Sequence, residues 1–369
     1  MSNFKSRKKY NILYTTSFST MAGGGQWSLY YLIKHLNKDR FHPVVFCPDE
    51  GELAQKMKAA GAEVIILTTG RIRSLSPSTV IKFISIIKER NIALIHTDST
   101  TETFYAGIAA RMMNVPLIWH IRAKDGEWLL DRALSAVSTK LILVADALKT
   151  RFTWINKRKA PTIYNGIDLE EFDSSVSPQS VRDEFNIDRD TIILACIGRI
   201  EQKKGQEYVV SAMKHVLHAK LLLAGMADET YLKQINTLCD ELGISDRVIF
   251  AGQRNDIPAL LRSIDILVLP TLTEAFPRVI LEAMAAAKPV VATDTGGNAE
   301  AVADTVTGFL VQTNDAATLA GKISELINNK EKRYQMGMAG RRRVEKNFDI
   351  RNIVRQVEEE YTKILESTN

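Results

Sequence analysis

Residues 266–285 read Ile-Leu-Val-Leu-Pro-Thr-Leu-Thr-Glu-Ala-Phe-Pro-Arg-Val-Ile-Leu-Glu-Ala-Met-Ala, and this stretch decides the fold. Its first four residues form a short apolar run, which predicts a buried strand that ends at Pro270. Pro277 suits the first turn of a helix, where its missing N–H would have no partner anyway. The apolar residues after Pro277 recur at helical spacing and continue that helix. A buried strand that leads through a polar turn into a helix is the repeating unit of a parallel α/β sheet.

Two glutamates frame the turn, Glu274 before the predicted helix and Glu282 inside it. The first N–H groups of a helix attract anions such as phosphate. Carboxylates beside an anion repel it, so we expect these glutamates to accept hydrogen bonds from hydroxyl groups instead. A phosphate flanked by two polyols describes a nucleotide sugar. On this stretch alone, a solvated helix face with two glutamates at a chance spacing stays open as the alternative.

The composition is that of a globular protein, and a length of 369 residues predicts two domains. No apolar run approaches the roughly 20 residues that span a bilayer. The basic start is followed by too short an apolar run for a signal peptide. Cys47, Cys196 and Cys239 are too few and too scattered for a disulfide framework. These features predict a cytoplasmic protein.

The charge is distributed unevenly along the chain. Residues 1–170 contain 24 Lys and Arg against 14 Asp and Glu, a net +10, whereas residues 171–369 contain 24 against 29, a net −5. The excess predicts an anionic partner for the first half, such as anionic lipid at the inner membrane face or an acidic acceptor. A contribution to solubility alone is the other interpretation. Nucleic acid is not expected, because the basic residues are scattered and no binding motif is present.

Strand and helix patterns alternate along the chain, which predicts an α/β fold with doubly wound parallel sheets. A polar segment at residues 170–179 separates two such series. We therefore expect two Rossmann-like domains, residues 1–170 and 171–350, and a last helix within residues 351–369 that packs back onto the first domain. Ligands of such sheets bind at the carboxyl ends of the strands, so the expected site is a cleft between the domains. The expected strands are residues 10–14, 43–47, 64–67, 92–95, 117–120, 141–144, 161–163, 192–197, 221–224, 248–250, 266–269 and 289–293.

A basic loop follows the first strand of the second domain, where residues 198–205 read Gly-Arg-Ile-Glu-Gln-Lys-Lys-Gly. Arg199 and Lys204 bracket this loop, and two fixed cations there can neutralise a diphosphate leaving group. A solvated basic turn is the alternative. This alternative is less favoured because the basic loop and the Glu274 loop both follow strands of one predicted sheet.

A glycine-rich loop, Gly23-Gly24-Gly25, follows the first strand of the first domain. Glycines allow a backbone to approach a phosphate closely. A dinucleotide-binding fingerprint would need a third glycine where Ser28 stands, so nicotinamide binding is not expected.

His120 ends an apolar strand, with Arg122 just after it, so its side chain is expected to face the cleft and to contact the sugar or its phosphate. A structural histidine is the alternative. The turn at residues 165–168, Asn-Gly-Ile-Asp, closes the first domain either as a hinge or as part of the site.

Residues 188–190 read Asp-Arg-Asp and resemble a metal-binding pair, but they lie in a polar connection that favours a solvated turn. Neither zinc-ligand spacing nor a hydrolase triad is present. We therefore expect a metal-free site in which Arg199 and Lys204 supply the positive charge.

Together these residues resemble the retaining glycosyltransferases of family 4, which have the GT-B fold of two Rossmann-like domains facing a cleft. The resemblance covers nearly the whole chain. The motifs that carry it are the glycine-rich first loop, His120, residues 165–168, residues 198–205, Glu274 with Glu282, and Gly296-Gly297-x-x-Glu300.

The resemblance implies separate roles for these residues. Arg199 and Lys204 would hold the donor diphosphate, Glu282 the ribose hydroxyls and Glu274 the donor sugar. His120 would lie beside the reacting carbon. The implied catalytic residues are His120, Glu274, Arg199 and Lys204. The implied donor-binding residues are Gly24, Gly25, Arg199, Lys204, Glu274, Arg278, Val279 and Glu282.

The implied reaction is transfer of a hexose from a UDP- or GDP-sugar to a hydroxyl of a glycan or lipid-linked acceptor, in glycan, polysaccharide or glycolipid synthesis. Retention would follow from front-face attack, with the leaving phosphate oxygen taking the acceptor's proton and with no metal or other cofactor. A sugar-nucleotide epimerase and a non-catalytic nucleotide-sugar-binding protein remain alternatives. Four residues depart from the commoner residues of the family and leave the sugar open: Ala275, Pro277, Arg278 and Ile121.

Overall fold

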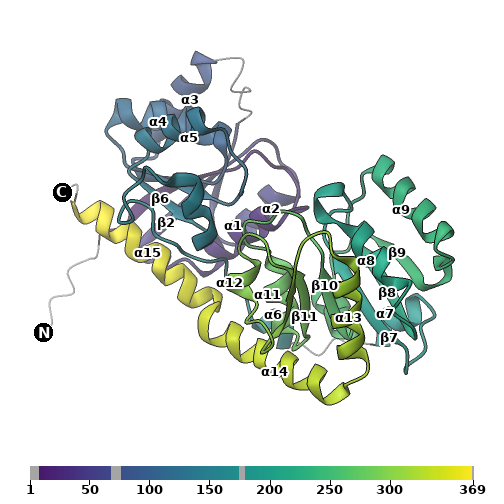
Figure 1. Cartoon of the computed structure of the whole chain (residues 1–369). Coiled ribbons are helices and arrows are strands. Elements are labelled where there is room, and N and C mark those ends of the chain that lie inside the picture. Colours follow the sequence, from purple (N-terminus) through teal and green to yellow (C-terminus); the bar gives the residue numbers. More distant parts are fainter. Residues whose placement is uncertain (1–7, 68–75, 174–178, 368–369) are drawn as a thin grey trace, which may run out of the picture. The chain divides into compact units, whose positions relative to one another are not determined.

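The computed structural model describes residues 8–67, 76–173 and 179–367. Contacts divide the chain into two units, one formed by Met1–Gly166 with Ile350–Asn369 and the other by Ile167–Asp349. Each unit is built on a parallel sheet of six strands that is covered by helices (Figure 1). Within the described ranges, no helix combines the length and the apolar character needed to cross a membrane.

The first unit has the strand order β3-β2-β1-β4-β5-β6, which reverses between β1 and β4. Its strands are β1 (Tyr10–Thr15), β2 (Phe41–Cys47), β3 (Glu63–Ile66), β4 (Ile92–Thr97), β5 (Leu117–Ile121) and β6 (Lys140–Leu143). Its helices are α1 (Gly24–His35), α2 (Glu52–Ala59), α3 (Pro77–Glu89), α4 (Thr100–Met113), α5 (Trp128–Val137), the 3-10 helix η2 (Asp146–Phe152) and α15 (Ile350–Ser367).

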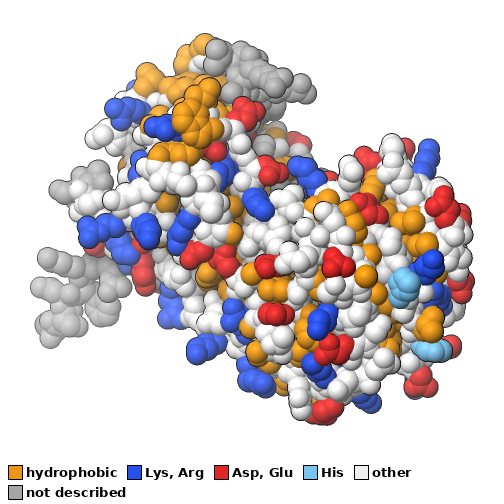
Figure 2. All heavy atoms as spheres, in the orientation of Figure 1, with side chains coloured by type: hydrophobic (Ala, Val, Ile, Leu, Met, Phe, Trp, Pro, Cys, Tyr) orange, Lys and Arg blue, Asp and Glu red, His pale blue; other side chains and the backbone are white. Residues whose placement is uncertain are grey.

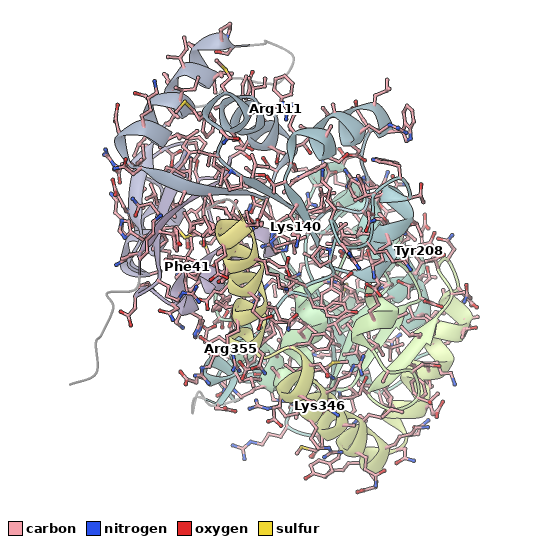
Figure 3. All side chains as sticks on the ribbon, turned by 90° about the vertical axis from the view of Figure 1, so that its left-hand side faces the viewer. Phe41, Arg111, Lys140, Tyr208, Lys346 and Arg355 are labelled. Atoms are coloured by element: carbon pink, nitrogen blue, oxygen red, sulfur yellow. The ribbon has the colours of Figure 1, made fainter. Side chains whose placement is uncertain are left out.

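The last helix, α15, is part of the core of the first unit and contacts α1 and β4. One apolar stripe of α15 is buried, because its apolar residues recur at helical spacing. Figure 3 shows Phe41 and Lys140 beside the helix, where the Phe41 ring lies 5.6 Å from the Tyr361 ring and Lys140 pairs with Glu360. The end of the chain therefore completes the first unit rather than the second.

The second unit repeats the same plan, with the order β12-β11-β10-β7-β8-β9. Its strands are β7 (Ile192–Ile197), β8 (Ala219–Ala224), β9 (Val248–Gly252), β10 (Ile266–Leu269), β11 (Val290–Thr293) and β12 (Gly308–Val311). Its helices are α6 (Glu170–Asp173), α7 (Gln179–Glu184), η3 (Gln202–Lys204), α8 (Gln206–Met213), α9 (Glu229–Glu241), η4 (Ser245–Arg247), α10 (Ile257–Ser263), α11 (Arg278–Ala285), α12 (Asn298–Ala301), α13 (Ala316–Ile327) and α14 (Lys330–Asn347).

Most expected strands are present, because strands buried on both faces carry continuous apolar runs that are visible in the sequence. Three local expectations differ from the structure. The strand expected at residues 161–163 is only an isolated bridge between Leu143 and Thr162. Strand β12 was not expected, since its four residues begin with glycine. Pro277 is the N-cap of α11 in an extended conformation, one residue before the first turn.

Candidate functional site

In the second unit, the loops after β7 and β10 lie at one edge of the sheet, because these strands are neighbours where the strand order reverses. The Leu272 N–H donates to the Lys203 carbonyl oxygen at 2.9 Å, and the Thr271 hydroxyl donates to the same oxygen at 3.1 Å. These bonds join the two loops and bring together residues predicted from each.

The Lys204 amine donates a hydrogen bond to the Glu274 carboxylate across this junction. The two side chains are only 20% and 14% exposed, so their attraction is screened less than that of a surface pair. Lys204 has three donor hydrogens and Glu274 has two acceptor oxygens, so each keeps capacity for a ligand. A diphosphate that binds Lys204 has to share the lysine with Glu274 or displace the Glu274 carboxylate from it.

Arg199 is placed differently from Lys204. Its side chain is 64% exposed and pairs with Glu201 at 3.0 Å. The backbone beside it is held by Gln206, a buried residue that we did not predict, whose amide donates to the Arg199 carbonyl oxygen at 2.8 Å. The sequence feature that could have pointed to Gln206 is its place as a polar residue directly after Gly205, at the first position of α8.

Helix α11 begins at Arg278, and no side chain caps its first turn. The Arg278 side chain is buried, and its Nε lies 3.4 Å from Glu282 Oε1, one helical turn further on. Burial raises the pKa of Glu282, and Arg278 opposes this rise. Val279 is half-buried in the same turn. Arg278 thus holds the carboxylate predicted to bind ribose.

Two glycines in these loops occupy positions that a side chain could not share. Gly205 has a φ of +65°, and a Cβ there would lie 2.3 Å from the Pro270 carbonyl oxygen. Gly296 has a φ of +54°, and its Cβ would lie 1.7 Å from the Glu274 carbonyl oxygen. The loop after β11 therefore packs directly against the backbone of Glu274, which fixes the position of that residue.

In the first unit, His120 lies in β5 and is 4% exposed. Its Nδ1 is 3.1 Å from Nε2 of His96, at the end of β4, and 3.2 Å from Nη2 of Arg122. Burial, reinforced by the charge of Arg122, lowers the pKa of His96 to about 3 and the pKa of His120 well below its usual range. Both rings are therefore neutral near pH 7. The sequence did not point to His96, because nothing distinguishes it from a structural histidine in a buried strand.

The glycine-rich loop and the 165–168 turn meet this histidine through Arg122. Gly24 and Gly25 form the first turn of α1, and a Cβ on Gly25 would meet Cδ of Arg122 at 3.7 Å. The Asn165 side-chain oxygen accepts from Arg122 Nη1 at 2.9 Å and lies 3.1 Å from the Ser28 hydroxyl. Ser28, where the dinucleotide fingerprint breaks, thus has a structural partner of its own.

Position 166 is a glycine because helix α15 passes close to the backbone at this point. A Cβ at Gly166 would lie 2.8 Å from the Cα of Ile350, the first residue of α15. The glycine is needed for this close approach, and its neighbour Ile167 belongs to the second unit. The division between the units therefore falls within the predicted turn.

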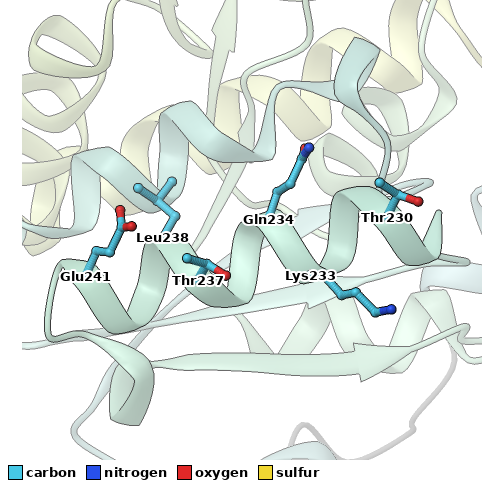
Figure 4. Close-up of a pocket in the computed structure, with 6 residues that line it drawn as sticks. All are labelled: Thr230, Lys233, Gln234, Thr237, Leu238 and Glu241. Carbon is cyan, nitrogen blue, oxygen red and sulfur yellow. The ribbon is translucent and has the colours of Figure 1, made fainter.

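Two other features lie apart from these residues. Asp188 and Asp190 are exposed in a turn before β7, as expected for a solvated connection. A surface hollow on α9 is lined by residues of that helix alone, almost all of them exposed (Figure 4): Thr230, Lys233, Gln234, Thr237, Leu238 and Glu241. A surface formed by one helix does not surround a ligand, so we assign it no function.

Solved structures with a similar fold match the elements of both units. HepE of Anabaena, solved in complex with UDP, matches with a TM-score of 0.86 over 96% of this chain and 100% of HepE, at 24% sequence identity. Sucrose-phosphate synthase of Thermosynechococcus elongatus matches with a TM-score of 0.85 over 97% of this chain and 100% of that protein, at 22% identity. Two Rossmann-like units with this topology define the GT-B fold, as predicted.

Family models extend the assignment to both units. Glycosyltransferase Family 4 matches residues 22–171, and Glycosyl transferases group 1 matches residues 179–343. The chain belongs to glycosyltransferase family 4, which confirms the predicted resemblance.

Curated relatives cover most of the chain at low identity. One is the UDP-Gal:alpha-D-GlcNAc-diphosphoundecaprenol alpha-1,3-galactosyltransferase of Escherichia coli, 24% identical over 80% of this chain and 82% of the relative. Another is the N,N'-diacetylbacillosaminyl-diphospho-undecaprenol alpha-1,3-N-acetylgalactosaminyltransferase of Campylobacter jejuni, 27% identical over 83% of this chain and 87% of the relative.

Proposed function

We propose that this glycosyltransferase moves a hexose, with retention of configuration, from a nucleotide sugar to an acceptor hydroxyl in the synthesis of a glycan, polysaccharide or glycolipid. The observation that carries the proposal is the loop junction after β7 and β10, where Lys204 meets Glu274 one loop away from the Arg278–Glu282 pair. A cation and a helix start beside two carboxylates match a diphosphate flanked by two polyols.

The donor roles follow from how each group is held. Lys204 and the more exposed side chain of Arg199 would neutralise the diphosphate, and the backbone N–H groups of Arg278 and Val279 would bind its oxygens. Glu282, fixed by Arg278, would accept hydrogen bonds from the ribose hydroxyls. Glu274 would accept hydrogen bonds from the donor sugar.

The proposed chemistry needs no enzymic nucleophile. The acceptor oxygen would attack the anomeric carbon from the face that the diphosphate leaves, and the leaving phosphate oxygen would take the acceptor's proton as the glycosidic bond forms. His120, neutral and buried, would lie beside the sugar, and Gly24 and Gly25 would allow the α1 backbone to approach it.

A UDP-sugar is the donor we propose first, with a GDP-sugar as the alternative. HepE was solved with UDP and with UDP-glucose, and the Escherichia coli relative is named for UDP-Gal. We also propose that no metal ion is required, since Arg199 and Lys204 supply the cations. Within the described part of the chain, no cluster of three or more His, Cys, Asp or Glu could hold a metal.

The acceptor we propose is lipid-linked, because the two relatives described above are named for diphosphoundecaprenol acceptors. The first unit offers a surface for such a membrane substrate on the neighbouring helices α3, α4 and α5. We define this apolar helix surface by its exposed large side chains, Ile81, Ile108, Met112, Trp128 and Leu129. Figure 2 shows apolar side chains gathered over these helices.

Basic side chains lie among the apolar ones. Lys82, Arg111 (labelled in Figure 3) and Arg132 are exposed on the same helices. The Arg132 guanidinium lies 4.9 Å from the Trp128 ring centre. Exposed Trp and Leu beside Lys and Arg are typical of a protein face that enters the interface of an anionic bilayer. We therefore propose that the apolar helix surface binds anionic membrane.

Vesicle binding tests this surface directly. The Trp128→Ser/Leu129→Ser double variant should bind phosphatidylglycerol vesicles about tenfold or more weakly, because two large apolar groups no longer enter the interface. Leu217→Ser, at a similarly exposed leucine of the second unit, is the matched control and should bind as the wild type does. Equal losses in both variants, or no vesicle binding at low salt, would end this part of the proposal.

The reaction itself is tested by incubating the protein with UDP- and GDP-sugars and measuring free nucleotide, with and without a lipid-linked acceptor and with EDTA present. Acceptor-dependent nucleotide release supports the transferase. Donor conversion without an acceptor would indicate an epimerase, and binding without turnover would indicate a nucleotide-sugar-binding protein. Glu282→Ala should weaken donor binding roughly tenfold to a hundredfold. Unchanged affinity would contradict the assigned site.

A further inference from the structure

A chain of buried polar groups connects the C-terminal helix to His120. Tyr14 of β1 and Tyr361 of α15 have hydroxyl oxygens 3.2 Å apart. The Tyr361 hydroxyl lies 2.5 Å from Nδ1 of His96, and Nε2 of His96 lies 3.1 Å from Nδ1 of His120. All four side chains are at most 4% exposed. Since water does not reach these bonds, the proton positions must satisfy one another.

Arg122 decides the direction of the chain. A guanidinium group can only donate, and Arg122 Nη2 lies 3.2 Å from Nδ1 of His120. Nδ1 of His120 is therefore the acceptor, and the proton of this neutral ring is on Nε2. The opposite tautomer would set an N–H of His120 against an N–H of Arg122.

The remaining protons follow in sequence. His96 must donate from Nε2 to Nδ1 of His120, which shares its lone pair between His96 and Arg122. Nδ1 of His96 then accepts from the Tyr361 hydroxyl, whose distance of 2.5 Å to this nitrogen is shorter than its 3.2 Å to the Tyr14 hydroxyl. The hydroxyl proton of Tyr361 can rotate between these two neighbours, and the shorter contact favours His96. Both nitrogens of His96 and Nδ1 of His120 then face partners of the opposite hydrogen-bonding kind.

The other ring nitrogen of His120 is left without a partner. Nε2 of His120 is buried and makes no hydrogen bond with any residue that the structure describes. A buried donor without an acceptor is unfavourable, so a ligand oxygen placed there gains the full benefit of the bond. The Asp98 carboxylate lies 3.9 Å from Arg122 Nε.

We propose that Arg122, His96 and Tyr361 are positioning residues that hold His120 as a neutral Nε2–H donor aimed at an oxygen of the bound sugar or phosphate. His120 then stabilises charge on that oxygen and does not act as a base. This inference rests on the proposed function for the identity of the ligand, whereas the tautomer can be measured in the free protein. Helix α15 then contributes to the site, because the hydroxyl of its Tyr361 determines which nitrogen of His96 carries the proton.

The tautomer is measured by long-range ¹H–¹⁵N correlation on protein labelled with ¹⁵N-histidine, with His120 assigned from the His120→Gln variant. We expect the Nε2–H coupling pattern at every pH from 6 to 8.5. Arg122→Met should allow the Nδ1–H form to appear, and Arg122→Lys, which keeps a donor, should restore Nε2–H. An Nδ1–H or doubly protonated His120 in the wild type would overturn the proposal, whatever the activity.

Two variants at His120 separate a donor from a base. The amide of glutamine can place an N–H near the position of Nε2, whereas the amide of asparagine reaches only the position of Nδ1. His120→Asn should lower kcat roughly tenfold to a hundredfold with little change in the KM for the donor, and His120→Gln should recover most of this loss. Equal loss in both variants would contradict the donor role. Absence of any sugar transfer by the wild type would refute the proposed function and leave the tautomer result standing.

Discussion

The Lys204–Glu274 pair leads to an unusual expectation: replacing an acidic residue of the site should tighten nucleotide binding. In the free protein, Glu274 occupies one of the donor hydrogens of Lys204 and places a negative charge beside the proposed diphosphate position. Glu274→Gln keeps the size of the side chain and an acceptor oxygen but removes the charge. UDP alone makes no sugar contact with Glu274, so it should gain from this change.

The magnitude follows from the burial of the pair. At 20% and 14% exposure, an effective dielectric constant of about 20 applies, and two like charges roughly 7 Å apart repel by about 2 kcal/mol. Screening by salt and relaxation of the lysine should leave about half of this, so UDP should bind roughly fivefold more tightly. Lys204→Ala removes a charge-assisted bond and should weaken UDP by about 1.5–3 kcal/mol, roughly tenfold to a hundredfold.

Isothermal titration with UDP, and turnover of the UDP-sugar, measure the two effects separately. Glu274→Gln should tighten UDP yet lower kcat, because the sugar contact is lost. Glu201→Gln is the control, since it removes the partner of the exposed Arg199, and it should change UDP affinity less than threefold. If Glu274→Gln weakened UDP as much as Lys204→Ala does, Glu274 would be orienting the lysine and the reasoning would be refuted.

Three further outcomes can be checked on stability and reactivity. The pKa of His96 is about 3 in the folded protein and 6.5 in the unfolded chain. The unfolded chain alone therefore binds a proton at this residue between these values, and the folded protein should lose stability as the pH falls from 6.5 towards 3. Melting temperatures measured across this range should show the loss, and His96→Gln should show a flatter pH profile. Gly296→Ala, whose Cβ would lie 1.7 Å from a carbonyl oxygen, should lower the unfolding free energy in urea by at least about 3 kcal/mol. Gly243 has a similar φ of +63°, but a Cβ there would meet no other atom, so Gly243→Ala should lower the unfolding free energy by only about 1 kcal/mol. Equal losses in the two variants would contradict the packing argument. Burial raises the pKa of all three cysteine thiols, to about 11 or 12, so native protein should not react with Ellman's reagent until denatured: Cys47, Cys196 and Cys239.

The sequence alone predicted the repeating architecture, because buried parallel strands and their helices have local patterns. It also placed Lys204, Glu274, Glu282 and His120 at strand ends or helix starts, where such sheets bind ligands. It did not predict β12 or the role of Gln206. A four-residue strand that starts with glycine has no local signal, and a buried glutamine is recognised only by the carbonyl group it binds.

The structure decided which of these residues meet. Lys204 pairs with Glu274 across 70 residues of chain, and Tyr361 reaches His96 across 265. The order of strands in a sheet is set by the packing of crossover helices, so contacts between distant loops cannot be read from local spacing. The stretch at residues 266–285 shows the division most clearly. Its residues determined a strand, a turn and a helix with two carboxylates, whereas its tertiary contacts gave Glu274 a lysine and turned Arg278 inward to Glu282.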